Sequence, residues 1–156
     1  NKKQIIMKLE LKHISPYFPY GINFLCFDVE SKEFEELPLL SINLRNDELE
    51  IGGMDIPIDE LPYPIGLEVK PILRPLSDLT KEIEGTEKTL LDKIVFESNG
   101  HCDAYEEWLE YYIDMNDKSC IEQAPFEIVQ ELFNLHFDVF GLIPQGIAID
   151  INTLEK

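Results

Sequence analysis

Apolar and polar residues alternate along the first half of the chain, and this period of two predicts β-strands. Leu9 and Leu11 alternate with charged residues between positions 8 and 12, so a half-buried strand is expected there. Residues 22–29 are rich in aromatic and β-branched side chains and predict a second strand. The sequence therefore begins with sheet-forming segments.

A polar turn and a proline-rich segment follow. The apolar segments 37–45 and 47–53 meet at the polar residues 45–47, which predicts a hairpin. Residues 57–75 contain five of the ten prolines of the chain. Because proline cannot donate to a central ladder, we expect ordered loop and an edge strand there, with residues 65–73 as the best strand.

Beyond residue 76 the apolar residues recur every three or four positions, and this period predicts helices. Residues 85–97 form the first. A second begins at Asp103, which can act as N-cap, with Glu106 three residues later completing a capping-box arrangement. A third begins near Pro125 and ends just before Gly141, the usual start and stop residues of a helix.

The chain closes with alternating residues, since Ile147, Ile149 and Ile151 would share one face of a strand. Strands first, helices second and one closing strand predict an α+β fold. We expect an antiparallel β-sheet, made of the N-terminal strands plus the C-terminal strand, with about three helices packed on one face. Residues 1–6 resemble a leader or non-native extension before a start at Met7, so a single domain is expected over 7–156.

The charge of the chain restricts its partners. It carries 31 acidic and 13 basic residues, a net charge of −18. Binding to duplex phosphates needs a basic footprint, so we expect no direct contact with nucleic acid, and none with an anionic membrane surface. Cysteines 26, 102 and 120 are widely spaced without a C-x-x-C pair, which favours reduced thiols in a cytoplasmic protein. No motif indicates a cofactor.

Half of the net charge lies between residues 101 and 140, where ten acids meet one base. Aromatic residues rimmed by charge suit a protein interface. We therefore predict a non-enzymatic protein-binding module, whose partner has a basic surface such as the nucleic-acid-binding groove of a host protein. A solvated acidic face is the alternative. The predicted interaction residues are Tyr105, Glu106, Glu107, Trp108, Glu110, Tyr111 and Asp114.

A metal site is a weaker alternative. His101, Cys102 and Asp103 are possible ligands, but structural zinc usually takes two close pairs and the second pair is missing. An enzyme of this kind would be a metal-assisted hydrolase that uses carboxylates of the 103–114 helix with His101 or His136. A virion or assembly component is a third alternative.

Three other places have simple structural interpretations. His136 and Asp138 do not face each other on a helix, so we predict a structural histidine and an aspartate that finishes the helix-end loop. Gly52 and Gly53 lie outside any phosphate-loop motif and predict a turn. In the cluster of Arg74, Ser77, Asp78, Thr80 and Lys81, capping of a short turn by Ser77 or Asp78 is simpler than an anion site.

Three segments together resemble a family. They are "LKHISPYFPYG" (11–21), "VKPILRPLSDLTKEI" (69–83) and "LHFDVFGLIPQGIAIDINTL" (135–154). They are similar to a family of small bacteriophage and prophage proteins to which no activity is assigned, so the resemblance implies no catalytic residue. What it implies is a context: a phage or prophage accessory protein in the cytoplasm of a bacterial host.

Overall fold

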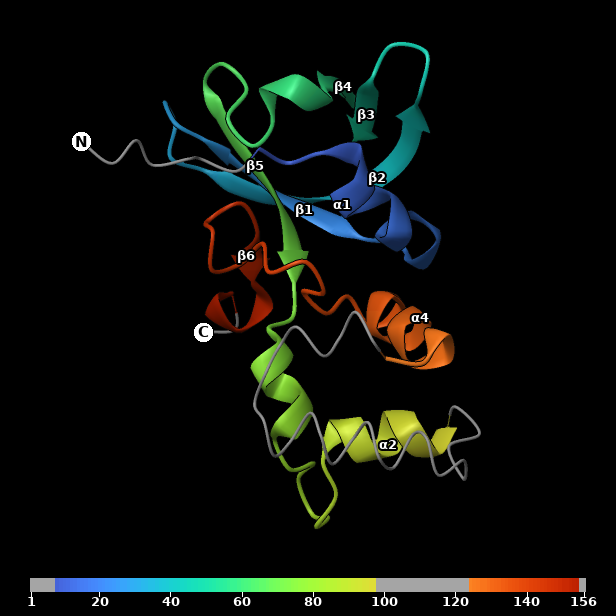
Figure 1. Cartoon of the computed structure of the whole chain (residues 1–156). Helices are drawn as coiled ribbons and strands as arrows, with labels where there is room; N and C mark the ends of the chain where they lie inside the picture. The colour runs from blue at the N-terminus through green and yellow to red at the C-terminus, as the bar shows by residue number, and fades with distance from the viewer. Residues whose placement is uncertain (1–7, 98–123, 155–156) are drawn as a thin grey trace, which may run out of the picture.

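A computed structural model describes residues 8–97 and 124–154 of the chain (Figure 1). Within these residues the strands are β1 Asn23–Asp28, β2 Phe34–Asn43, β3 Glu48–Ile51, β4 Met54–Pro57, β5 Leu67–Leu73 and β6 Ile149–Asp150. The α-helices are α1 Leu11–Ile14, α2 Leu90–Glu97 and α4 Phe126–Asn134. The 3-10 helices are η1 Ser15–Tyr20, η2 Ile58–Glu60, η3 Leu76–Thr80 and η5 Ile151–Thr153.

The strands form a mixed sheet in the order β4-β3-β2-β1-β5-β6. Neighbours are antiparallel except β5 and β6, which pair in parallel over two residues. The predicted α+β class is confirmed, and the closing strand returns to the sheet as expected, though parallel to its neighbour. Among the described helices, α1 and η1 lie against the sheet, whereas α2 and α4 lie beyond the end of β5 (Figure 1).

The strand predicted over residues 8–12 is wrong, because this segment enters a short helix, α1. The N–H of Glu10 donates to Nδ1 of His13 at 3.0 Å, and the N–H of His13 donates to the carbonyl of Glu10 at 3.0 Å. Leu9 and Ile14 are both buried, one on each side of this turn. Two alternating leucines are compatible with either a strand or a turn. Packing of Leu9 and Ile14 on the sheet favours the turn.

Burial of His13 makes the stability of the protein depend on pH. Its pKa is lowered chiefly by burial, with the charge of Glu10 acting in the opposite direction. As the pH falls below the ordinary value near 6.5, the unfolded chain takes up a proton that the folded chain resists, so stability decreases toward the lowered pKa and is constant above 6.5. We expect the urea midpoint of the wild type to drop more between about pH 7 and about pH 5 than that of His13→Gln. Equal drops in the two proteins would contradict this role.

Both predicted turns in the first half are confirmed. β2 pairs with β3 across residues 44–47, and β3 pairs with β4 across Gly52 and Gly53. Both glycines have positive φ, 57° and 91°, as a type I′ hairpin turn requires at its two central residues. The strand β4 that this turn creates was not predicted from the sequence.

The two glycines of this turn allow a matched test. A Cβ at Gly52 would lie 2.8–2.9 Å from atoms of Leu37, whereas a Cβ at Gly53 would meet nothing within 4 Å. Backbone strain alone costs about 1–2 kcal/mol for a residue forced into the left-handed region. We expect Gly53→Ala to lower the free energy of unfolding by about that amount and Gly52→Ala by more, measured by urea denaturation. Equal losses would show that Leu37 moves aside without cost.

Strand β5 lies inside the sheet, so its prediction as an edge strand is wrong. Two segments pair with its outer edge, and a third pairs with the chain just beyond it. The carbonyls of Pro64 and Pro62 accept the N–H groups of Leu67 and Val69 at 2.9 and 2.8 Å, and β6 then pairs with the last two residues. Beyond the strand, the N–H of Arg74 donates to the carbonyl of His136 at 2.8 Å. The prolines contribute their carbonyl acceptors, so they reinforce this edge.

Helix α4 begins after Pro125, as predicted, but it ends at Asn134 instead of just before Gly141. His136 has a φ of +63°, and its N–H donates to the carbonyl of Phe133. The N–H of Phe137 donates to the carbonyl of Leu132. These two bonds form a Schellman motif, with His136 in the left-handed position that glycine usually occupies. The motif that terminates the helix therefore has a histidine where glycine is usual.

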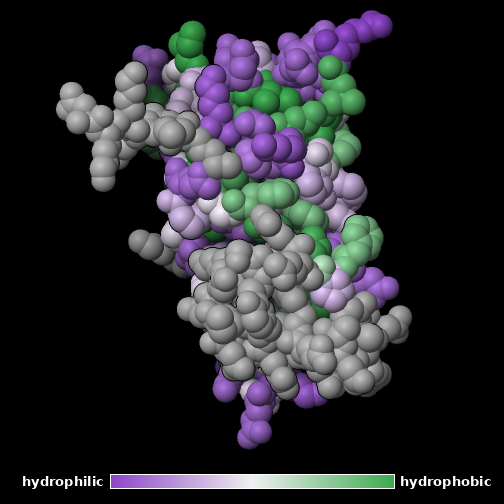
Figure 2. All heavy atoms as spheres, in the orientation of Figure 1, coloured by the Kyte–Doolittle hydropathy of each residue, from purple (hydrophilic) through white to green (hydrophobic). Residues whose placement is uncertain are grey.

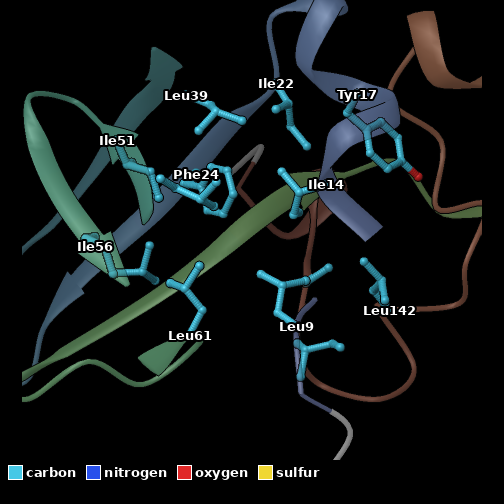
Figure 3. Close-up of a cluster of buried hydrophobic side chains, with 14 of the residues drawn as sticks. Leu9, Ile14, Tyr17, Ile22, Phe24, Leu39, Ile51, Ile56, Leu61 and Leu142 are labelled. Atoms are coloured by element: carbon cyan, nitrogen blue, oxygen red, sulfur yellow. The ribbon is translucent and has the colours of Figure 1, made fainter. Parts of the chain in front are cut away.

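The interior consists of two apolar clusters. In the first, Phe24, Leu39, Ile51 and Ile56 from the sheet face Ile14 and other side chains of the N-terminal segment (Figure 3). The second cluster lies beyond β5 and consists of Leu76, Leu79, Leu91, Ile94, Ile128, Leu132 and Phe137. The sheet half and the helical half thus have separate cores.

Candidate functional site

The sites favoured from the sequence lie outside the described residues. This applies to the predicted interaction residues Tyr105, Glu106, Glu107, Trp108, Glu110, Tyr111 and Asp114. It applies equally to the metal alternative of His101, Cys102 and Asp103, and to the 103–114 helix. Both interpretations stay predictions.

Two properties of the described part can be stated. Within residues 8–97 and 124–154, no three or more His, Cys, Asp or Glu side chains gather so that they could hold a metal ion. No helix in these ranges is long and apolar enough to cross a membrane.

The corner after α4 is a structural junction. The carboxylate of Asp138 is buried and accepts the N–H groups of Leu142 and Ile143 at 2.7 and 2.8 Å, which confirms that it finishes this loop. Nε2 of His136 lies 2.7 Å from the carbonyl oxygen of Tyr20 and donates a hydrogen bond to it, because a carbonyl can only accept. The two side chains have separate partners, and the arrangement is not a catalytic dyad.

Tyr17 ties this corner to the N-terminal segment. Its hydroxyl donates to the carbonyl of Phe137 and accepts the N–H of Val139 at 3.2 Å. The ring is fully buried and packs edge-on against Phe133, with centroids 5.0 Å apart. Burial raises the pKa of Tyr17 well above its ordinary value, so the hydroxyl is protonated and serves as a hydrogen-bonding group.

The cluster at the end of β5 is also internally paired. The predicted cap by Ser77 or Asp78 is wrong, because the N-cap of η3 is Pro75 and no side chain caps it. The carboxylate of Asp78 instead accepts Lys81 Nζ at 2.7 Å and Asn152 Nδ2 at 3.0 Å. Burial would raise the pKa of Asp78, but these hydrogen bonds and the charges of Lys81 and Arg74 outweigh it and lower the pKa. Lys81 is therefore already paired with a carboxylate of the same cluster.

The strongest candidate site is the face of the sheet opposite the core. Side chains alternate along a strand, so the buried Phe24 and Cys26 of β1 leave Leu25 and Phe27 on the other face. The strand register extends this face into two rows across β2, β1 and β5. One row is Phe34, Phe27 and Glu68, and the other is Glu36, Leu25 and Lys70.

A hollow of about 700 Å³ lies over these two rows. Ile149 of β6 and the C-terminal residues Thr153 and Leu154 line it from the other side. Its floor is mostly apolar, and Phe34 is 68% exposed. We call this surface, made of the two rows together with Ile149, Thr153 and Leu154, the open face.

The cation of the open face is already neutralised. Nζ of Lys70 forms an ion pair with the carboxylate of Glu68 and lies 5.3 Å from the ring centroid of Tyr63. Burial lowers the pKa of Lys70, but its contacts with Glu68 and Tyr63 outweigh burial and raise it. Lys70 therefore stays protonated and paired, and Glu36 supplies the remaining charge of the open face.

Exposed apolar residues continue the open face around one end of the sheet. The N–H of Val29 donates to the carbonyl of Gly66 at 3.1 Å, which brings the β1–β2 turn beside the loop before β5. Val29, Tyr63 and Ile65 are exposed there, and Ile65 is 99% exposed. On the side of the molecule in Figure 2, hydrophobic residues likewise reach the surface between hydrophilic ones. We call Val29, Tyr63 and Ile65 the apolar rim.

Sequence reasoning did not identify the open face, although one signal for it was present. Residues 24–27 are apolar at every position, not only at alternate ones. A strand that is apolar on both faces is typically buried on both faces. The run predicts a strand, but it does not indicate which segment or partner covers the second face.

Comparison of the chain with known protein families, curated proteins and solved structures finds no match.

Proposed function

We propose that this protein acts by binding another protein, and that the open face is its docking surface. The observation that carries the proposal is the hollow with a mostly apolar floor, beside an aromatic residue that is 68% exposed. Aromatic side chains are enriched at the energetic centres of protein interfaces. Exposed apolar patches with a polar border often mark interaction sites.

The position of the apolar rim supports the same proposal. Four of the nine large hydrophobic residues that are exposed in the described ranges are Phe34 and the three residues of the rim. They come from three segments of the chain and gather at one end of the sheet. Scattered surface hydrophobics need no explanation, whereas a group of this kind is typical of a contact surface.

The biological context of this proposal rests on the resemblance to phage and prophage proteins. On that basis the protein is an accessory factor in the cytoplasm of a bacterial host, and the partner is a host or phage protein. The acidic aromatic segment over residues 105–114 would add a second contact region, as the sequence predicts.

The docking surface can be tested with short peptides. A random peptide library is selected against the wild-type protein, and the best binder is titrated by fluorescence anisotropy. We expect Phe34→Ser to weaken binding at least about tenfold, because truncating a central aromatic anchor costs about 2 kcal/mol or more. In NMR spectra, the amide signals of Leu25, Phe27 and Lys70 should shift when the peptide is added.

Phe126→Ser is the matched control. Phe126 is 77% exposed and belongs to α4, far from the open face in the chain and outside its lining. We expect this variant to bind the peptide as the wild type does. If Phe34→Ser also binds normally, or if the shifted signals belong to another surface, the open face is not the docking site.

A further inference from the structure

We infer that the open face takes a partner segment in which a large apolar side chain lies next to a lysine or arginine, with Glu36 as the residue that selects the basic group. This inference rests on the proposed function, because it specifies the chemistry of the partner at the same surface. The supporting observation is the distribution of charged residues around Phe34.

Phe34 is the first residue of β2 and directly follows the acidic turn that joins β1 to β2. Residues 28–36 contain five acids, Asp28, Glu30, Glu33, Glu35 and Glu36, and one base, Lys32, a net charge of −4. Glu68 adds a carboxylate on the floor of the hollow, and Lys70 neutralises it. A basic segment is attracted to this surface, whereas an acidic or phosphorylated segment is repelled by it.

Glu36 is the carboxylate that can receive the basic group. It lines the hollow and lies on the same strand as Phe34, two residues away, so the two side chains share a face about 7 Å apart. Its Oε1 accepts Asn23 Nδ2 at 2.9 Å in an exposed position. A carboxylate has lone pairs for several donors, so a lysine or arginine can bind without displacing Asn23.

A second copy of this chain suits the open face poorly. A symmetric dimer places the same surface on both sides of the contact. That arrangement would place two hairpins of charge −4 in one interface. Opposite charge across an interface favours association, and like charge disfavours it. The fitting occupant is therefore another protein.

The inference is tested by a double-mutant cycle with a selected peptide. From the library described above we take a binder, replace its lysine or arginine by glutamine, and measure both peptides against wild-type protein and Glu36→Gln. We expect each single change to weaken binding about two- to fivefold and the double change to cost little more, since exposed ion pairs contribute modestly and only residues in contact are coupled.

Glu35→Gln is the matched control. Glu35 is next to Glu36 on β2 but pairs with Cys26 and belongs to the other face of the sheet. Glu35→Gln removes one negative charge, as Glu36→Gln does, but from the other face of the sheet. It should therefore lower the affinity less than Glu36→Gln does and show no coupling to the basic residue of the peptide. Equal effects of Glu35→Gln and Glu36→Gln would mean that only the overall charge matters, which overturns the role of Glu36.

The outcomes separate this inference from the function on which it rests. If selected peptides lack basic residues, or if the cycle shows no coupling, while Phe34→Ser still weakens binding at least about tenfold, the partner chemistry is wrong and the docking surface stands. If Phe34→Ser has no effect on binding, both the proposed docking surface and the proposed partner chemistry are wrong. If wild-type protein forms a dimer in sedimentation that Phe34→Ser disrupts, the occupant is a second copy and the inference is overturned.

Discussion

Replacing Phe137 by alanine is expected to lower the free energy of unfolding by about 3–5 kcal/mol, the usual cost of removing a large aromatic side chain from a core. Its ring is fully buried in the second apolar cluster, with Leu132 and Ile128 among its neighbours. The guanidinium of Arg74 lies over the same ring, 5.2 Å from its centroid. The loss would be a large part of the stability of a domain of this size.

Phe126→Ala is the matched control, because it deletes the same atoms from a residue that is 77% exposed at the start of α4. We expect this variant to stay within about 0.5 kcal/mol of the wild type. Urea denaturation followed by circular dichroism measures both changes. Similar losses in the two variants would mean that the second cluster contributes little to folding.

The position of Phe137 shows where the sequence predicted the fold correctly and where it did not. Helical spacing with Leu132 and Phe133 predicts that the side chain of Phe137 is buried, and it is. The same pattern predicts a helix that ends just before Gly141, whereas α4 ends at Asn134. Histidine adopts positive φ far less often than glycine, so the local sequence gives no clear sign of the end at His136.

The strands were predicted better than the N-terminal turn, for a physical reason. Residues 22–29 and 65–73 carry many apolar and β-branched side chains, and β1 and β5 form within them. Residues 8–12 offer only two apolar positions, which cannot separate a strand from a turn. There the choice depends on contacts with the sheet, which a local pattern does not contain.

The candidate site could be predicted only in part. The sequence shows that the chain is acidic, and from this it predicts a partner with a basic surface. It could not show that Phe34, Ile65 and Tyr63 gather at one end, because that arrangement depends on the bond between Val29 and Gly66 and on the strand register. Such proximity arises from tertiary structure.

Replacing Asp138 by alanine is expected to cost about 2–5 kcal/mol, because two N–H groups would lose their acceptor where water has little access. Its carboxylate is buried and binds the N–H groups of Leu142 and Ile143. Bonds to a charged acceptor are stronger than neutral ones, which increases the loss. Asp138→Asn keeps one acceptor oxygen and should give an intermediate value in urea denaturation.

Asp28→Ala separates the effect of burial from that of the hydrogen bonds themselves. The carboxylate of Asp28 also accepts two N–H groups, from Glu30 at 2.9 Å and Ser31 at 3.1 Å, but in an exposed turn. Water can replace those bonds, so we expect a loss of about 1 kcal/mol or less. If Asp138→Ala cost no more than Asp28→Ala, the corner after α4 would be open to water. The "LHFDVFGLIP" segment would then not be the rigid junction between the two cores that its hydrogen bonds indicate.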